Sequence, residues 1–264
     1  MHPTPALPKD LTVVPAPSHW QRVDFISDVH LEANACATYD AWQHFMASTT
    51  ADALFVLGDL FEVWVGDDNN DAFALRCIEV LKRTSQRLPI YFLCGNRDFL
   101  IGSRMRAASG MQGLSDPAIL DVGTQRLLLS HGDSLCLDDV DYLQFRQQVR
   151  QHQWQEDFLA KPLIERQHIA RGLREQSEAR KHTTLTYADV DASAATSWLR
   201  STQCQTLIHG HTHQPAMHTL GEGLSRWCLS DWHAEATPPR LEVVSWLKAD
   251  AQSPSGGLRR SALP

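Results

Sequence analysis

The segment Ala53-Leu54-Phe55-Val56-Leu57-Gly58-Asp59 places five apolar residues directly before a glycine and an aspartate. A short apolar run that ends at a turn residue is typical of a buried strand. Four more segments have the same form, with a polar motif after each apolar run. The runs are Val23–Ser27, Ile90–Cys94, Leu127–Ser130 and the shorter Thr206–Ile208. Helical spacing of apolar residues separates several of them, so the pattern predicts an α/β fold.

The motifs after these strands contain seven side chains of the types that bind metal ions. They are Asp28, His30, Asp59, Asn96, His131, His211 and His213. In an open α/β sheet the carboxyl ends of the strands share one edge, where ligands bind, so these residues could meet. Their three oxygen donors and four imidazoles suit Mn²⁺, Fe²⁺ or Zn²⁺. Each motif alone is weak, because Gly-Asp also forms turns and caps. The five motifs in this order predict a metal site.

The intervals between the motifs indicate an insertion. The first four follow one another at 31, 37 and 35 residues, and each interval is about one βαβ step. From His131 to His211 the interval is 80 residues. We therefore expect an inserted helical segment at about 139–200, which would lie over the metal site as a cap. The alternative is a helix pair that only completes the core.

The two ends of the chain differ from its centre in composition. Residues 1–20 hold five prolines and no apolar stretch of the kind found in signal peptides. We expect flexible tails at 1–20 and 249–264, and one domain over 21–248. Six scattered cysteines without a C-x-x-C pair predict reduced thiols in a cytoplasmic protein. The net charge of −7 argues against broad binding to nucleic acid.

The order of the motifs, D-x-H, G-D, G-N-x-D, H and G-H-x-H, resembles the calcineurin-like metallophosphoesterases over about Val23–Trp246. The resemblance implies a four-layered α/β fold, with two mixed sheets flanked by helices, in place of one doubly wound sheet. It also implies two divalent ions. The first would be bound by Asp28, His30, Asp59 and His213. The second would be bound by Asp59, Asn96, His131 and His211, with Asp59 bridging the two.

Arg97 departs from the general family pattern, which has histidine after the asparagine. Arginine does not donate a proton usefully, because its pKa exceeds 12. It can hold a phosphate through two N–H groups at once. This favours a leaving group that departs as a stable phosphate anion, and hence a diphosphate bond. The alternative is a structural ion pair between Arg97 and Asp98.

Three longer segments, Gly58–Asp68, Gly95–Leu100 and His131–Asp139, resemble the UDP-2,3-diacylglucosamine hydrolases of lipid A biosynthesis. That resemblance implies cleavage of UDP-2,3-diacylglucosamine to UMP and 2,3-diacylglucosamine 1-phosphate, with Mn²⁺ as the favoured ion. It also implies peripheral contact with the cytoplasmic face of the inner membrane, with neither nucleic acid nor an obligate protein as partner. The catalytic residues would be Asp59, Asn96, Arg97 and His211.

Further substrate contacts are expected on the cap. By the same resemblance, Asp139, Ser177, Lys181 and Thr184 join Asn96, Arg97 and His211 at substrate-contact positions. The family has Asn where Lys181 stands and Lys where Thr184 stands, so the positive charge is displaced by three residues. Arg174 shares a helical face with Ser177 and Lys181. Tyr142 could line an acyl pocket or belong to the core.

The segment Lys161–Lys181 is basic, with six basic and three acidic residues, and apolar residues are interspersed along it. A basic amphipathic cap suits an acylated anionic substrate at an anionic membrane surface. The alternative is a solvated, charged helix face.

Two other functions stay open. One is a diphosphatase for dinucleoside polyphosphates or other nucleotide-linked substrates on the same core. The other is a non-catalytic scaffold with this fold, which is disfavoured because all seven donors are present.

Overall fold

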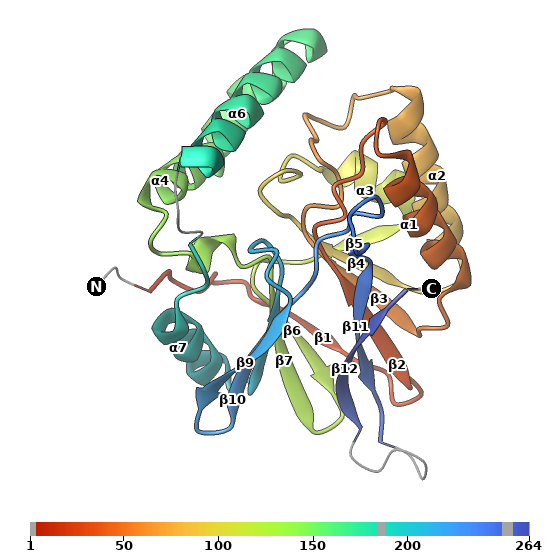
Figure 1. The fold of residues 1–264 in the computed structure, drawn as a ribbon, viewed down its shortest axis with the longest axis vertical. Coiled ribbons are helices and arrows are strands. Elements are labelled where there is room, and N and C mark those ends of the chain that lie inside the picture. Colours follow the sequence, from red (N-terminus) through yellow and green to blue (C-terminus); the bar gives the residue numbers. More distant parts are fainter. Residues whose placement is uncertain (1–3, 184–187, 250–255, 264) are drawn as a thin grey trace.

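Two six-stranded mixed sheets form the centre of the molecule (Figure 1). This computed structural model describes residues 4–183, 188–249 and 256–263, and only the backbone at 175–183. The first sheet has the strand order β1 (Thr12–Pro15), β6 (Ala118–Val122), β7 (Gln125–Ser130), β8 (Thr206–His209), β10 (Leu224–Cys228) and β9 (Ala216–Gly221). The second has the order β12 (Gly257–Ala262), β11 (Glu242–Leu247), β2 (Arg22–Ile26), β3 (Ala53–Leu57), β4 (Ile90–Leu93) and β5 (Met111–Gly113).

The apolar run of β3 is continuous because both faces of its sheet are covered. Phe55 and Leu57 pack in the cluster between the two sheets, together with residues of the first sheet such as Leu129. Leu54 and Val56 point to the opposite face and pack in the cluster that includes residues of the helices over the second sheet. One strand therefore contributes to two hydrophobic layers.

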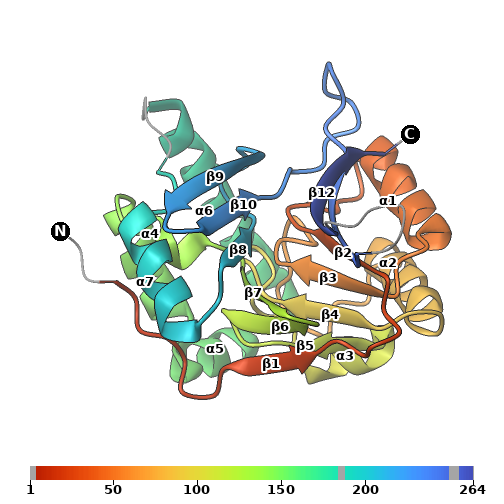
Figure 2. The same ribbon diagram turned by 90° about the horizontal axis from the view of Figure 1, so that it is seen from below.

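Helices complete a four-layered arrangement. The helices α1 (Cys36–Ser48), α2 (Ala72–Ser85) and α3 (Ser103–Ser109) lie over the second sheet (Figure 2). The helix α7 (Ala192–Thr202) covers the first sheet, where Trp198 and Leu199 pack with Leu128 and Leu207. The α/β fold with two mixed sheets flanked by helices is thus confirmed.

The chain between β7 and β8 contains the expected insertion. After a 3₁₀ turn (Asp133–Leu135) come α4 (Val140–Val149), α5 (His152–Leu159) and α6 (Leu163–Thr183), and α6 extends away from the sheets (Figure 1). We call α4–α6 the cap. The last part of the predicted insertion, α7, packs on the first sheet and belongs to the sheet layers.

Strands form within both segments expected to be flexible tails. β1 pairs in parallel with β6, and β12 pairs antiparallel with β11. Both are edge strands, and an edge position tolerates proline. The prolines of residues 1–20 therefore do not exclude a strand such as β1. The 35-residue interval before His131 also differs from the expected βαβ step. It holds no simple βαβ step, because the chain passes from β4 through β5 and β6 into the other sheet.

No helix in the described part of the chain combines the length and the apolar character that crossing a bilayer requires.

Arg166 attaches the cap to the segment that follows β3. Its side chain is 2% exposed, Nε donates to the carbonyl of Lys161 at 2.9 Å, and Nη1 donates to Asp68 Oδ1 at 2.9 Å. Arg166→Ala should therefore lower stability by about 2 kcal/mol, the typical loss for charged hydrogen bonds. Thermal melting should fall and limited proteolysis of the cap should accelerate. Arg171→Ala, at an exposed position of α6, is the control. Equal melting and cleavage in both variants would show that Arg166 does not hold the cap.

Candidate metal centre

The backbone turns sharply at most of the expected metal ligands. Asp28, His30, Asp59 and His213 have φ of 52°, and His211 has φ of 68°. Only two other non-glycine residues in the described part of the chain have positive φ. The left-handed region costs energy for such residues, and such strain concentrates at functional sites. Here the turns let donors leave their strand ends and point at one centre.

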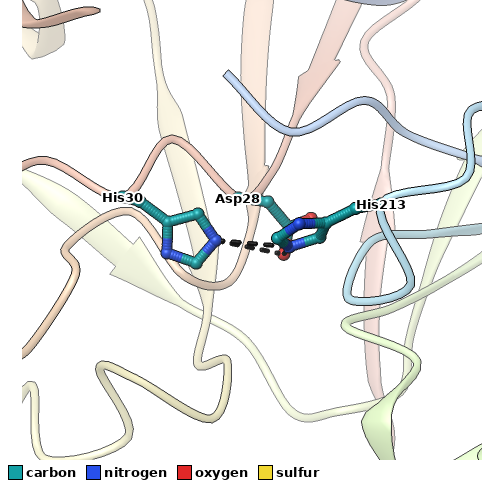
Figure 3. Close-up of side chains that lie close together, drawn as sticks. All are labelled: Asp28, His30 and His213. Atoms are coloured by element: carbon teal, nitrogen blue, oxygen red, sulfur yellow. Dashed lines mark hydrogen bonds and ion pairs between the residues drawn. The ribbon is translucent and has the colours of Figure 1, made fainter. Parts of the chain in front are cut away.

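The first donor group consists of Asp28, His30 and His213 (Figure 3). The Nε2 atoms of the two imidazoles lie 3.3 Å apart. Asp28 Oδ1 lies 3.3 Å from Nε2 of His213 and 3.9 Å from Nε2 of His30. Burial alone would raise the pKa of Asp28, but the neighbouring imidazoles, with His213 foremost, lower it well below its usual value. The group therefore offers one buried carboxylate and two ring nitrogens to a shared point.

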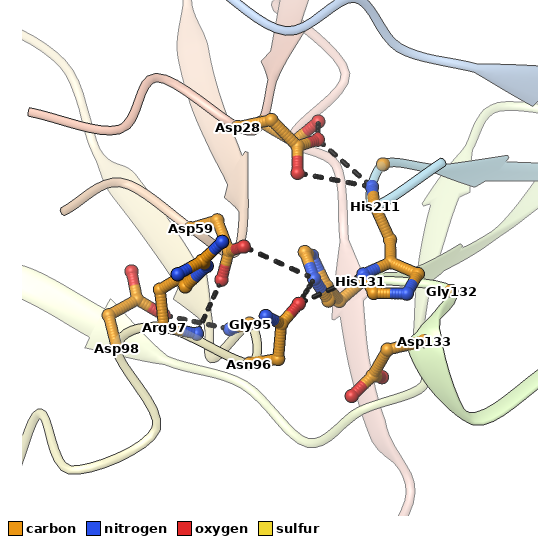
Figure 4. A network of polar contacts seen from close by, with 12 residues as sticks. Asp28, Asp59, Gly95, Asn96, Arg97, Asp98, His131, Gly132, Asp133 and His211 are labelled. Atoms are coloured by element: carbon orange, nitrogen blue, oxygen red, sulfur yellow. Dashed lines mark hydrogen bonds and ion pairs between the residues drawn. The ribbon is translucent and has the colours of Figure 1, made fainter. Parts of the chain in front are cut away.

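The second donor group surrounds Asn96 (Figure 4). Asn96 Oδ1 lies 2.8 Å from Nε2 of His131 and 2.9 Å from Nδ1 of His211. Asp59 Oδ2 lies 3.8 Å from the same Nε2 of His131. The opposite nitrogen of that ring, Nδ1, lies 2.9 Å from the carbonyl oxygen of Leu57. A backbone carbonyl behind a histidine orients the ring and leaves Nε2 facing the site.

The two groups adjoin. Potential ligand atoms of Asp28, Asp59 and His131 all lie within 4.8 Å of one another. Asp28 of the first donor group therefore lies next to Asp59 and His131 of the second. Asp59 Oδ1 also accepts a hydrogen bond from the backbone N–H of Arg97 at 2.8 Å. The structure thus brings the seven expected donors together, whereas the bridging role of Asp59 stays a prediction.

The charges in the site favour a cation. Burial would lower the pKa of His131, but the carboxylates of Asp59, Asp28 and Asp133 together raise it to about 9. Burial and the neighbouring His131 lower the pKa of His211 to about 3. Histidine binds metals in its neutral form, so a metal ion here would take the place of the proton on His131.

Two glycines permit the close approach of the ligand loops. A Cβ atom at position 95 would lie 2.1 Å from Asp59 Oδ1, and one at position 210 would lie 2.3 Å from Asp28 Oδ2. No other residue type fits at these distances, because every other side chain carries that carbon.

Arg97 does not pair with its neighbour Asp98. The Arg97 Nη1 atom lies 3.1 Å from Glu62 Oε1. Asp98 is fully buried and accepts hydrogen bonds from the backbone N–H groups of Leu60 and Gly95, both at 2.8 Å. Burial, with the charge of Asp59, raises the pKa of Asp98 to about 7. The alternative reading of Arg97 as the partner of Asp98 is therefore wrong, and the guanidinium remains beside the metal ligands.

A cavity of about 1200 Å³ lies between the ligand loops and the cap. His30, Asn96, Arg97 and His211 line it on the side of the sheets. The cap contributes many apolar side chains, among them Phe145, Trp154, Phe158 and Leu173. Side chains of the ligand loops and of the cap therefore line the same cavity, and the function of the cap stays a prediction.

The structure locates only some of the expected substrate contacts. Asp139 and Tyr142 line the cavity, and Asp139 also caps α4 by accepting from the N–H of Tyr142 at 3.1 Å. The hydroxyl of Tyr142 donates to Asp133 at 2.5 Å, and its ring centre lies 5.6 Å from that of His211. Arg174 lines the cavity as well. Ser177 and Lys181 lie on α6 where side chains are not described, and Thr184 lies outside the described residues.

Sequence reasoning missed the residues that join the cap to the ligand loops. Arg146 Nε donates to Asp133 at 2.8 Å, and Arg150 Nη2 donates to the carbonyl of Gly95 at 2.8 Å. Their i,i+4 spacing on α4 was an available signal for a shared helical face. Glu62 was also missed, although it lies three residues after Asp59.

Known proteins resemble this chain in sequence over most of its length. Residues 21–215 match the family model described as calcineurin-like phosphoesterase. A protein of Chromobacterium violaceum named UDP-2,3-diacylglucosamine hydrolase is 45% identical over 220 residues, which cover 80% of this chain and 90% of that protein. A protein of Escherichia coli with the same name is 41% identical, with 81% and 92% covered. Among solved structures, the E. coli phosphoesterase Yfce has a TM-score of 0.44 at 16% identity, over 92% of this chain and 100% of that one.

Proposed function

Because the chain belongs to the calcineurin-like phosphoesterase family, we propose that it hydrolyses the diphosphate bond of UDP-2,3-diacylglucosamine. The products are UMP and 2,3-diacylglucosamine 1-phosphate. The observation that carries the proposal is the position of the donors, at one wall of a cavity whose other wall includes the apolar side chains of Phe145, Trp154, Phe158 and Leu173. Such a space accommodates a substrate with an anionic centre and acyl chains, and the relatives named for this substrate match most of the chain.

The donor set fits two divalent ions, for which Mn²⁺ is the proposed identity. Three side-chain oxygens and four imidazoles are a mixture that Mn²⁺ accepts. We assign Asp28, His30, Asp59 and His213 to one ion. We assign Asp59, Asn96, His131 and His211 to the other. When bound, such a pair supplies an activated water and neutralises charge on the phosphoryl group.

The side chains around the donors would orient the substrate. Asn96 turns Oδ1 to the imidazoles, which leaves its Nδ2 group to donate to a phosphoryl oxygen. His211 has Nδ1 near Asn96, so Nε2 is the ring nitrogen available to the substrate. Arg97 would bind the departing sugar phosphate with its guanidinium. The further proposed substrate contacts, on the cap or directly beside it in sequence, are Asp139, Tyr142, Arg174, Ser177, Lys181 and Thr184.

We propose that the cap meets the cytoplasmic face of the inner membrane. Ile164 and Leu159, near the turn between α5 and α6, are 74% and 41% exposed, and the cationic Lys161 lies between them in sequence. Apolar side chains next to a basic one favour contact with an anionic lipid surface. A lipid substrate could then enter the cavity without crossing much water.

Metal removal followed by substrate comparison tests the function. Protein treated with a chelator and dialysed should lose turnover of UDP-2,3-diacylglucosamine, and Mn²⁺ should restore it, because the donors alone cannot activate water at neutral pH. Dinucleoside polyphosphates should be cleaved much more slowly, since they carry no acyl chains to contact the apolar side chains that the cap contributes to the cavity. Phosphorus NMR identifies the products. Faster cleavage of the dinucleotides would replace the proposed function, and turnover of neither with Mn²⁺ bound would favour a scaffold.

A further inference from the structure

We propose that Glu62 is a positioning residue whose single carboxylate sets the metal ligand His30 and the phosphate-binding Arg97 at the same time. The proposal rests on the proposed function of the site and deepens it. Glu62 Oε2 lies 3.0 Å from His30 Nδ1. Glu62 Oε1 lies 3.1 Å from Arg97 Nη1 and 3.1 Å from Nε of the cap residue Arg174. One side chain thus contacts the metal ligand His30, the residue Arg97 that is proposed to bind the leaving group, and the cap residue Arg174.

The backbone holds Glu62 opposite His30. Beyond the ends of β2 and β3 the two chains stay paired, through a bridge between Leu31 and Phe61. The N–H of His30 donates to the carbonyl of Asp59 at 3.0 Å, and the N–H of Glu62 donates to the carbonyl of Leu31 at 3.2 Å. Glu62 is only 8% exposed. Its position is therefore fixed by the same pairing that places two of the metal ligands.

Basic side chains surround the carboxylate of Glu62. His30, Arg97 and Arg174 each have a nitrogen within 3.1 Å of one of its two oxygens. A buried carboxylate with cationic neighbours restrains them, because each neighbour would otherwise lose its counter-charge. Arg97 is thereby held beside the ligands before any phosphate binds.

The contact with His30 determines which ring nitrogen faces the metal site. A proton on Nδ1 is favoured by the nearby Oε2, although the two atoms are not aligned as an ideal hydrogen bond in this structure. That tautomer leaves Nε2, which lies 3.3 Å from Nε2 of His213, free to bind a cation. Carboxylates behind metal-binding histidines typically contribute 10- to 100-fold in affinity.

The substitution Glu62→Gln distinguishes the positioning role of Glu62 from simple packing. It has nearly the same shape, but one of its two terminal atoms accepts hydrogen bonds and the other donates them. With the oxygen toward Arg97, the NH₂ group faces His30 Nδ1 and favours the tautomer with the proton on Nε2. With the oxygen toward His30, the NH₂ group faces the guanidinium. Glu62→Gln cannot satisfy both neighbours.

The matched control is Glu32→Gln. Glu32 Oε2 also lies near Arg174, at 3.4 Å from Nη1, but in the described part of the chain Glu32 forms no ion pair with His30 or Arg97. We expect Glu62→Gln to weaken Mn²⁺ binding by about 10- to 100-fold in calorimetry of metal-free protein, and Glu32→Gln to change it less than about twofold. Glu62→Asp keeps the charge and both oxygens, and should recover part of the affinity. If Glu62→Gln melts at a lower temperature than the wild type, the Mn²⁺ affinities of Glu62→Asp and Glu32→Asp are compared instead.

A double-mutant cycle tests the link to Arg97. The loss in kcat on UDP-2,3-diacylglucosamine caused by Glu62→Gln, measured at saturating Mn²⁺, should shrink when Arg97 is already alanine, because residues in one contact are not additive. An unchanged Mn²⁺ affinity in Glu62→Gln would overturn the proposal. It would also be overturned if the loss in kcat of the double variant equalled the product of the two single losses. The calorimetry needs no turnover. If the wild-type protein did not cleave UDP-2,3-diacylglucosamine, the proposed function would fail. The calorimetry would still decide the role of Glu62 toward His30.

Discussion

Asp59→Ala should abolish turnover, with kcat/KM for UDP-2,3-diacylglucosamine falling at least about a thousandfold. The carboxylate serves both sides of the site: Oδ2 lies 3.8 Å from His131 Nε2, and Oδ1 holds the N–H of Arg97 at 2.8 Å. Its removal takes away the proposed bridging ligand and a support for the loop that carries Asn96. Loss of a two-metal clamp is worth several kcal/mol of barrier, and each 1.36 kcal/mol is about tenfold in rate.

The measurement combines kinetics with metal analysis of the purified variant. Asp52→Ala is the matched control, since Asp52 lies at the opposite end of β3 and accepts hydrogen bonds from the N–H groups of Gln21 and Arg22. It should lose some stability and keep two ions per chain. Retained turnover by Asp59→Ala with two ions bound would contradict the assignment of the site.

The sequence was sufficient to predict strands and donors wherever an apolar run ended at a ligand motif. β3 spans the expected residues 53–57, because its uninterrupted apolar run requires burial on both faces. The assignment of strands to sheets could not be read in this way. The 35 residues before His131 match a βαβ interval in length, yet they carry the chain from one sheet to the other. The number of residues between two motifs gives only the length of chain that joins them. A βαβ step and a crossing from one sheet to the other need similar lengths.

Partners of charged residues were the least predictable part of the site. Arg97 and Asp98 are adjacent, but Asp98 is drawn into the interior by two backbone N–H groups, and Arg97 turns to Glu62, which is 35 positions away. Glu62 lies inside an otherwise apolar segment, and nothing local distinguishes it from a solvated glutamate. Its three contacts come from separate parts of the chain, so only the folded arrangement identifies them.

Arg97→Ala should reduce cleavage of UDP-2,3-diacylglucosamine about a hundredfold or more, yet change cleavage of an activated aryl phosphodiester by only a few fold. A sugar phosphate leaves with charge on its oxygens, which a guanidinium can bind with two N–H groups. An activated aryloxide is stable without that help. Removing a donor aimed at developing charge typically costs about 10² to 10³ in kcat. The substitution should spare the ligand loop, because Arg97 is tied to it by its backbone: the N–H donates to Asp59 Oδ1 at 2.8 Å and the carbonyl accepts from the N–H of Trp64 at 3.0 Å.

Arg97→Lys separates charge from geometry in the same experiment. Lysine keeps the positive charge but loses the planar pair of donors, so its rate on the lipid diphosphate should fall between those of the wild type and Arg97→Ala. Bound metal should be unchanged in both variants, since the Arg97 side chain offers no ligand atom. Equal losses on the two substrates would instead place the effect of Arg97 on the metal ligands or on the attacking water. The choice of arginine at this position would then give no reason to prefer a diphosphate over other phosphodiesters.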